Sequence, residues 1–310
     1  MTDTYFRTLS LADLEELNRS IDSNFLICAD CLKVLEMLPD ECIDLIYIDP
    51  PFATQSNRRT KRNKRGYADC WSGGLGQFME FLTQRLSHMH RVLKYTGTIY
   101  VHIDYRTVHY VRIELDRIFG ADNFLNEIIW SYKTGGVSKR WFGRKHQNIL
   151  SYAKKIGEHK FNVIREGKFR TDGLNVDLQG RFYKSTKKGR LYFNSDGPAL
   201  TDVWEIPFLS TVGLERTGYP DQKPLALLDR IIRASSCEGD IVADFFAGSG
   251  TTGIAAQNLN RRWILTDNNS QAVELIEQRF RGKGNVHHTA KTCEDCLFDN
   301  FSSSRCSTEG

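Results

Sequence analysis

The stretch Asp240-Ile-Val-Ala-Asp-Phe-Phe-Ala-Gly-Ser-Gly-Thr-Thr252 joins an apolar run to a glycine-rich turn and then to a helical pattern. The segment 240–245 is typical of a buried strand, and residues 251–259 have the spacing of a helix. The glycines at 248 and 250 let the backbone turn tightly and come close to a ligand. A strand, a tight turn and a helix in this order predict a doubly wound α/β sheet.

The same alternation continues on both sides of this stretch. Strands are predicted over residues 25–28, 43–48, 98–102 and 263–266. Helices are predicted over residues 31–38, 77–93, 108–119, 225–234 and 271–281. The segments 127–132 and 148–152 are expected to pair as neighbouring strands. Strands that alternate with helices indicate a mainly parallel sheet with helices on both faces.

A second turn, Asp49-Pro50-Pro51-Phe52, follows the predicted strand 43–48. Open α/β sheets bind their ligands beyond the carboxyl ends of parallel strands. An exocyclic amino nitrogen of adenine or cytosine is a poor nucleophile, because its lone pair is delocalised into the ring. The Asp49 carboxylate can accept one N–H and the Pro50 carbonyl the other, while Phe52 offers a face for an extruded base. An ordinary surface turn is the alternative.

The glycine turn suits a ligand that carries a nucleoside. Asp267 is expected to end the next strand, 17 residues after Gly250, where a carboxylate can accept hydrogen bonds from two ribose hydroxyls. We interpret the turn as neither a dinucleotide fingerprint nor a phosphate-binding P-loop, and no Gly-Lys-Ser/Thr follows it. A nucleoside without a pyrophosphate fits better.

Positive charge is unevenly spread along the chain. The net charge is +4, but residues 131–217 hold 17 Lys/Arg and 8 Asp/Glu, which gives that segment +9. A second cluster packs six cations into residues 58–65: Arg58, Arg59, Lys61, Arg62, Lys64 and Arg65. A solvated loop is one interpretation, and a phosphate-binding surface beside the 49–52 turn is the one we prefer.

The remaining features indicate a cytosolic protein. No apolar run approaches the ~20 residues that a membrane-spanning helix needs, and residues 1–20 lack the apolar core of a secretory signal. The eight cysteines are therefore expected to be reduced thiols. Cys293 and Cys296 near the C-terminus have zinc-ligand spacing, but they form a single pair, and we predict no metal site.

These motifs together resemble the β permutation class of bacterial DNA amino-methyltransferases. The resemblance covers residues 24–154 and 218–281, and it has the catalytic turn first and the glycine turn last. The blocks that carry it are 24–52, 91–100, Gln222-Lys223-Pro224-Leu225, and Asp244 to Thr252. This order of blocks implies a circularly permuted, Rossmann-like methyltransferase sheet.

The resemblance implies S-adenosylmethionine as the cofactor. Asp267 would hold its ribose, Asp30 would lie near its adenine ring and Lys223 would lie by its carboxylate. The implied cofactor-binding residues are Asp30, Lys223, Asp244, Phe246, Gly248, Ser249, Gly250, Thr251 and Asp267, and the implied catalytic residues are Asp49, Pro50, Pro51 and Phe52. Two positions depart from the family pattern: Phe245 replaces a proline, and Phe52 replaces a more usual tyrosine.

The same resemblance divides the chain into four parts. Residues 21–155 would form the catalytic half of the methyltransferase domain, and residues 218–284 the cofactor-binding half. Residues 156–217 would be an inserted target-recognition region, whose aromatic and basic residues suit DNA contacts. Residues 285–310 would be a flexible tail.

Double-stranded DNA is the expected partner, with no membrane partner, while a homodimer and a cognate restriction endonuclease stay open. The acidic Asp49 favours the N6 of adenine, and the N4 of cytosine is the alternative. No Pro-Cys dipeptide occurs, which argues against methylation of the cytosine ring carbon. Two further alternatives are an enzyme acting on RNA or on a protein glutamine, and an inactive DNA-binding module of the same fold.

Overall fold

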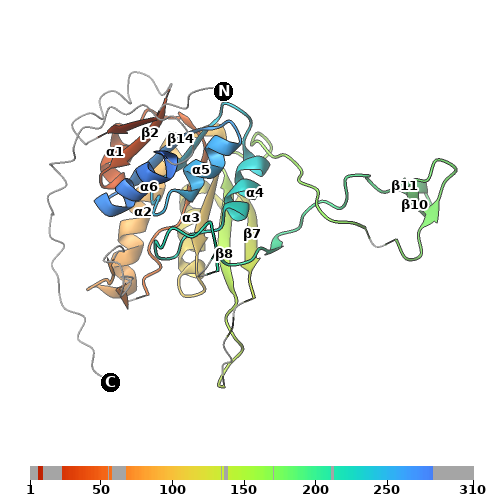
Figure 1. The fold of residues 1–310 in the computed structure, drawn as a ribbon, viewed down its shortest axis with the longest axis horizontal. Helices are drawn as coiled ribbons and strands as arrows, with labels where there is room; N and C mark the ends of the chain where they lie inside the picture. The colour runs from red at the N-terminus through yellow and green to blue at the C-terminus, as the bar shows by residue number, and fades with distance from the viewer. Residues whose placement is uncertain are drawn as a thin grey trace.

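A computed structural model describes residues 6–9, 23–54, 56–57, 68–133, 135, 139–169, 171–210 and 213–281. Its centre is a large sheet (Figure 1). The sheet has nine strands in the order β1-β2-β14-β13-β3-β6-β8-β7-β12. The strands are β1 (Phe6–Leu9), β2 (Asn24–Cys28), β3 (Ile43–Ile48), β6 (Leu93–Ile103), β7 (Phe124–Ser131), β8 (His146–Ala153), β12 (Val203–Glu205), β13 (Ile241–Asp244) and β14 (Arg262–Asp267). All neighbours are parallel except β6 with β8 and β7 with β8.

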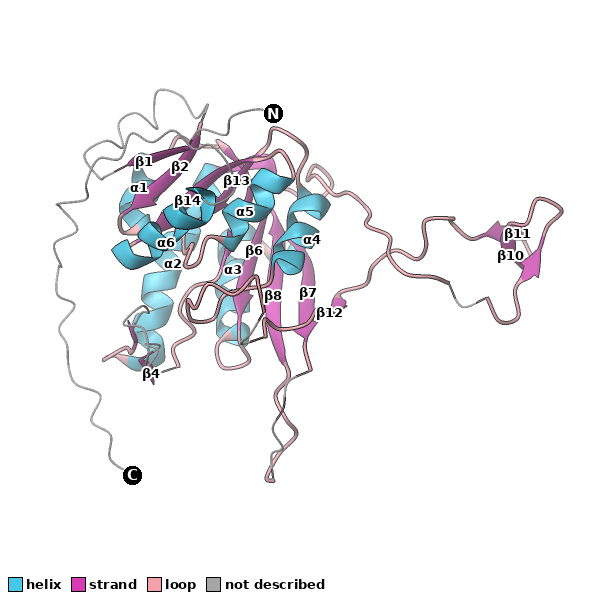
Figure 2. Ribbon diagram, viewed as in Figure 1, coloured by secondary structure: helices cyan, strands magenta, loops and turns pink. Residues whose placement is uncertain are grey.

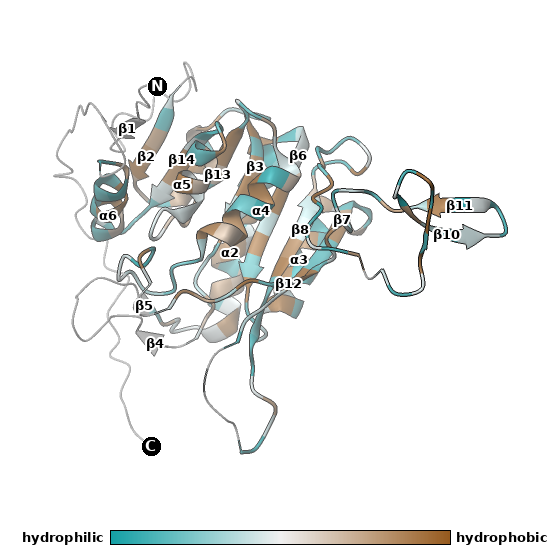
Figure 3. Ribbon diagram, turned by 45° about the vertical axis from the view of Figure 1, so that its right-hand side comes forward, coloured by the Kyte–Doolittle hydropathy of each residue, from teal (hydrophilic) through white to brown (hydrophobic). Residues whose placement is uncertain are grey.

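Within the described residues, three helices cover each face of the sheet. One layer holds α1 (Cys31–Met37), α2 (Gly74–Val92) and α3 (Val108–Phe119), and the other holds α4 (Leu225–Ser235), α5 (Thr251–Asn258) and α6 (Ser270–Arg281). Successive side chains of β3 alternate between the layers: Ile46 and Ile48 join the first core, and Leu45 and Tyr47 join the second. Figure 3 shows the central strands as the most apolar part of the ribbon. Burial on both faces explains why these strands are continuous hydrophobic runs.

The chain changes direction across the sheet between β13 and β3. From β3 it passes through α2 to β6 on one side, and from β13 it passes through α5 to β14 on the other. The two crossover helices lie on opposite faces. Such a switch point leaves a crevice at the carboxyl ends of the strands, where ligands of doubly wound sheets bind. The turns after β3 and β13 both lie there.

Residues 156–217 build a projecting module and also return to the main sheet. The module contains a three-stranded sheet of β9 (Asn175–Val176), β10 (Phe182–Thr186) and β11 (Gly189–Tyr192), which stands well away from the body (Figure 1). Residues 164–166 and 198–200 pair at its base, through Leu200 N–H to the Ile164 carbonyl and Glu166 N–H to the Pro198 carbonyl. We call these paired residues the neck. After the neck, β12 adds to the edge of the main sheet beside β7.

Most sequence predictions of elements are confirmed. The strand 43–48 and the helix 108–119 have the predicted bounds, and segments 127–132 and 148–152 lie in the antiparallel pair β7–β8. β1 and β12 were not predicted. The division of the chain into domains and the permutation stay predictions. In the part of the chain that the structure describes, no helix is both long and apolar enough to cross a membrane.

Candidate active site

Four neighbouring strands bring the predicted site residues to one edge of the sheet. Asp30 lies just beyond β2, Asp267 ends β14, the glycine turn follows β13, and Asp49 follows β3. These strands are adjacent in the order β2-β14-β13-β3 and run parallel. Their carboxyl ends therefore bring together residues more than 200 positions apart in the sequence.

The glycine turn has the backbone shape that only glycine adopts without strain. Gly248 and Gly250 have φ angles of +51° and +73°, and Gly250 caps the start of α5. A Cβ at Gly250 would lie 2.7 Å from Cγ1 of Ile276, and one at Gly248 would lie 3.2 Å from Cε1 of Tyr219. Neighbouring side chains therefore leave little room for a side chain at either position.

Gly253 corrects one sequence interpretation. It lies three residues after Gly250, so Gly248, Gly250 and Gly253 do have the spacing of a dinucleotide fingerprint, and the interpretation that excluded one was wrong on this point. A Cβ at Gly253 would lie 2.6 Å from Cδ1 of Leu265 in β14. This glycine allows α5 to pack closely on the sheet, which is the role of the third glycine in such turns.

Two carboxylates hold the turn in place. Asp244 accepts hydrogen bonds from the Phe246 N–H at 3.0 Å and the Thr252 hydroxyl at 2.5 Å, which ties the two ends of the turn together. Asp267 accepts from the N–H groups of Gly248 and Asn269, at 2.8 and 2.9 Å. Burial raises the pKa of Asp244 to about 7 and that of Asp267 to about 6, although these hydrogen bonds oppose the shift.

The hydroxyls of Ser249 and Thr251 are used within the protein. Both side chains are buried, and their oxygens lie 3.1 Å apart. Arg279 of α6 donates to the Ser249 carbonyl and to the Thr251 hydroxyl. Arg279 was not predicted from the sequence, because its place in α6 fits an ordinary surface helix. Its two hydrogen bonds stabilise the glycine turn from the side of α6.

Asp30 lies beside an unexpected cation and an aromatic wall. Its carboxylate caps α1 through the Leu32 N–H and accepts two hydrogen bonds from Arg85, at 2.7 and 2.8 Å. The Arg85 guanidinium stacks 3.5 Å from the ring centre of Phe81, which lies 6.2 Å from the ring of Phe246. Phe81 fits the apolar stripe of α2 in the sequence, so nothing there separates it from an ordinary core residue.

A buried cation from a distant segment holds the catalytic turn. Lys223 is buried, and its ammonium donates to Oδ2 of Asp49 and to the Asp221 carbonyl. Phe52 is 8% exposed, with the Lys223 ammonium 5.3 Å from its ring centre. The resemblance implied that Lys223 lies by the cofactor carboxylate, and that role stays a prediction. In the structure its ammonium forms an ion pair with Asp49.

Asp69 pins the loop that follows the catalytic turn. Its buried carboxylate accepts four hydrogen bonds: from the N–H groups of Ala53 and Thr54, from the Thr54 hydroxyl and from the Trp71 indole, at 2.7 to 3.1 Å. Ala53 has a φ of +54°, a shape that non-glycine residues adopt only when their surroundings hold it. Asp69 therefore orients the exit from Phe52. No local pattern predicted this, because 15 residues separate Asp69 from Thr54.

A buried polar chain backs the catalytic turn. The His102 ring lies 6.1 Å from the ring of Phe52, and it joins the Tyr47 hydroxyl at 2.8 Å to the Gln147 amide oxygen at 2.7 Å. Burial keeps the pKa of His102 well below its usual value, with a further lowering from Lys223. Because the Gln147 amide oxygen can only accept, this contact places a proton on Nε2, and a neutral ring would then accept from the Tyr47 hydroxyl at Nδ1.

Two other predictions concern residues outside the described part of the chain. The basic cluster 58–65 and the C-terminal cysteines lie outside them. Among the residues that the structure describes, no three His, Cys, Asp or Glu side chains come together as a metal site requires. Cys28 and Cys31 are buried, and burial raises their pKa values to about 11 and about 12.

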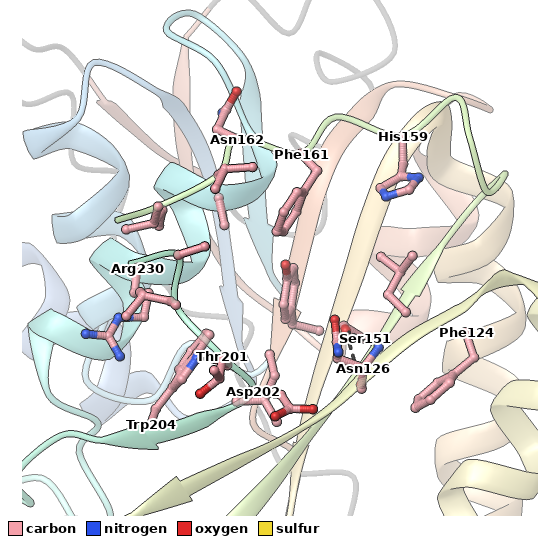
Figure 4. A pocket seen from close by; sticks show the side chains of 18 of the residues that line it. Phe124, Asn126, Ser151, His159, Phe161, Asn162, Thr201, Asp202, Trp204 and Arg230 are labelled. Atoms are coloured by element: carbon pink, nitrogen blue, oxygen red, sulfur yellow. Dashed lines mark hydrogen bonds between the residues drawn. The ribbon is translucent and has the colours of Figure 1, made fainter. Parts of the chain in front are cut away.

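A cavity of about 550 Å³ lies elsewhere, between α4 and the strands β6 to β8 (Figure 4). Tyr100, Phe161 and Trp204 line it, together with Asn126 and Arg230. None of the predicted catalytic or cofactor-binding residues lines it. The cavity is therefore separate from the predicted site residues.

Comparison with known proteins agrees with this geometry. A family model described as DNA methylase, for N6 and N4 methyltransferases, matches residues 43–278. The type II methyltransferase M.HpaI of Haemophilus parainfluenzae is 31% identical over 88% of this chain and 81% of its own length. The DNA adenine methyltransferase YhdJ of Escherichia coli is also 31% identical, over 84% of this chain and 83% of its own length.

Solved structures show the same fold at lower identity. The cytosine-N4-specific PvuII DNA methyltransferase aligns with a TM-score of 0.58 and 19% identity, over 90% of this chain and 88% of that one. The M1.HpyAVI–SAM complex aligns with a TM-score of 0.54 and 21% identity, over 82% and 98%. At these identities the likeness shows the fold alone.

Proposed function

Because the chain belongs to the DNA methylase family of N6 and N4 methyltransferases, we propose that it methylates the exocyclic N6 of adenine in duplex DNA. It is an S-adenosylmethionine-dependent DNA amino-methyltransferase. The observation that carries this function is the meeting of Asp49, at the end of β3, with the glycine turn, at the end of the neighbouring strand β13.

The glycine turn has the features that S-adenosylmethionine requires. Gly248 and Gly250 have positive φ angles and no room for a side chain, so their backbone can lie directly against a ligand. Asp267 supplies a hydrogen-bond acceptor beside this turn. The aromatic wall of Phe81 and Phe246, next to Asp30, offers an apolar face for an adenine ring. When bound, S-adenosylmethionine supplies an electrophilic methyl group on its sulfonium sulfur.

Asp49 and Pro50 are proposed to prepare the target nitrogen. An ionised carboxylate has about four acceptor positions on its two oxygens, so the bond from Lys223 leaves room for a base N–H. The Pro50 carbonyl would accept the second N–H. Together the two acceptors favour a pyramidal nitrogen with a directed lone pair, and most of the rate gain comes from this positioning.

Lys223 is proposed to keep the Asp49 carboxylate charged and oriented before the substrate binds. Its side chain is 6% exposed, and a buried charge of this kind needs a partner. The pair keeps the Asp49 carboxylate oriented at the edge of the sheet. Stacking of the target base on Phe52 stays a prediction, since protein covers most of that ring here.

The Asp267→Ala variant should bind S-adenosylmethionine more weakly by roughly 1.5–3 kcal/mol, the scale of one hydrogen bond to a charged group. The variant also leaves the Gly248 N–H without its present acceptor, which loosens the turn. Calorimetry with purified protein measures the affinity. Asp177→Ala, in the projecting module, is a control that should bind as the wild type does. Unchanged affinity in Asp267→Ala would remove this residue from the ribose site.

The cations of residues 58–65 are proposed to contact DNA phosphates near the target base. The cluster lies between β4 (Ser56–Asn57) and β5 (Ala68–Asp69), which pair as a hairpin, and Asp69 ties that hairpin to the catalytic turn. Replacing all six cations with serine should weaken binding on every DNA sequence. It should also flatten the slope of log affinity against log salt by about 0.9 for each phosphate that the protein no longer neutralises. An unaltered slope would show that the cluster touches no phosphate.

Modification-sensitive sequencing of DNA from cells that express the chain tests the proposed function directly. We expect N6-methyladenine at one recurring short sequence, and far less of it in cells expressing Asp49→Ala. N4-methylcytosine would reject adenine as the target while keeping the enzyme class, and unmodified DNA would reject the activity. The type II names of several relatives support a paired restriction endonuclease, and a homodimer remains a proposal.

A further inference from the structure

The hairpin arm between β7 and β8, of which the structure describes residues 132–133, 135 and 139–145, extends beyond the same edge of the sheet as the catalytic turn. β8 is antiparallel to β6, so this arm begins where β6 ends, and β6 is the neighbour of β3 and Asp49. Figure 2 shows the arm as a long loop below that edge, far from β10 and β11. Lys145 donates to the Gly135 carbonyl at 2.6 Å, which links the two limbs of the arm.

The arm carries an apolar ring that is almost fully exposed. Phe142 is 98% exposed and its neighbour Trp141 is 59% exposed. Single exposed apolar residues are common on protein surfaces and need no explanation by themselves. Here the ring stands on a projecting arm at the catalytic edge, so a partner that enters the active site from solvent passes close to it.

The charge of the arm favours a polyanionic partner. Residues 133–145 contain five Lys/Arg and no Asp or Glu. The guanidinium carbon of Arg144 lies 4.2 Å from the centre of the Tyr105 ring and 5.3 Å from that of Trp141, and the guanidinium donates to the Tyr105 hydroxyl. Tyr105 follows the end of β6, so these contacts attach the arm to the edge that carries the site.

We propose that Phe142 enters the base stack of duplex DNA beside the target nucleotide and takes the place that the extruded base leaves. The proposal rests on the proposed function, since an enzyme that acts on a base amino group must take the base out of the duplex. Apolar side chains of DNA-bending proteins enter base steps in this way, and aromatic rings stack on any base. The cations of the arm contact the phosphates on either side of Phe142.

The test compares single-turnover methylation on two duplexes that carry the target sequence, one fully paired and one with an abasic site opposite the target base. Phe142→Ala should slow methylation of the paired duplex by about tenfold or more, the lower range for removal of one stacked ring. On the abasic duplex, where little energy is needed for extrusion, its rate should return to within about threefold of the wild type. Phe142→Tyr keeps the ring and should retain most of the activity on both duplexes.

Ile113→Ala is the matched control, because Ile113 is a 64% exposed apolar residue on α3, a helix that carries none of the predicted site residues. It should leave both rates unchanged. A wild-type rate for Phe142→Ala on the paired duplex would overturn the proposal, and so would an equal reduction on both duplexes. If the wild-type chain methylates no DNA, the proposed function fails and this inference fails with it. A methylating wild type with an unaffected Phe142→Ala overturns the inference alone.

Discussion

The Asp49→Ala variant is expected to methylate DNA at least ~10²-fold more slowly than the wild type, the scale for removing one preorganised polar group from a reacting centre. The carboxylate acts chiefly at the transition state, where the amino nitrogen becomes pyramidal and positively charged. Cofactor binding should survive, because the glycine turn and Asp267 supply that site. DNA binding should also survive, because phosphate contacts dominate affinity. Single-turnover methyl transfer with saturating cofactor measures the rate.

The ion pair with Lys223 makes Asp49→Asn the essential companion variant. Alanine leaves a buried ammonium without its carboxylate, whereas the asparagine amide oxygen can still accept from Lys223 or from the base. We therefore expect a smaller reduction in rate for Asp49→Asn than for Asp49→Ala. The rate of Asp49→Asn should still be below that of the wild type, because the amide lacks the charge that stabilises the developing cation. A near-normal rate in Asp49→Ala would contradict the proposed mechanism. Failure of that variant to bind cofactor would move Asp49 into the cofactor site.

The Gly250→Ala variant should be less stable and should bind cofactor more weakly. Its φ of +73° costs an alanine roughly 1–3 kcal/mol of strain. Its Cβ would also lie 2.7 Å from Cγ1 of the buried Ile276, and overpacking of this kind costs about 1–3 kcal/mol more. Relief of the clash must shift the turn, which carries the amides of the proposed cofactor site. Urea unfolding and calorimetric titration with S-adenosylmethionine measure the two effects.

Gly239→Ala separates backbone strain from the steric clash. Gly239 has a φ of +79°, and a Cβ there would meet nothing within 4 Å. This control should be destabilised by backbone strain alone and should bind cofactor normally. Equal destabilisation in the two variants would show that the Ile276 side chain moves away without cost. Normal cofactor binding by Gly250→Ala would show that the cofactor site tolerates the shift of the turn.

Local patterns predicted most elements of the fold because each pattern is contained in one segment. The helix 108–119 has an apolar stripe and ends at Gly120, and the strand 43–48 ends at two prolines. β12 is different: three residues within an irregular region become a strand only because β7 has a free edge beside them. Its Trp204 is buried against the sheet for the same reason.

The same distinction applies to the site. The catalytic and glycine turns could be proposed from the sequence because their residues are contiguous, and the resemblance added further cofactor-binding residues to them. Asp69, Arg85 and His102 were missed because their chemistry depends on partners 15 to 55 residues away. An aspartate in a polar loop and an arginine on a helix have no pattern that separates them from solvated residues. Only the tertiary structure assigns them as supports of the site.

The neck at the base of the projecting module makes that module exchangeable. The chain leaves at residue 166 and returns at residue 198, and the N–H of the first donates to the carbonyl of the second at 3.1 Å. A foreign segment whose ends lie this close can be grafted between them while β12 keeps its register on β7. Asp49 and the glycine turn lie outside the graft. A different module can therefore be inserted at the neck, by evolution or by engineering, while the residues of the proposed active site stay unchanged.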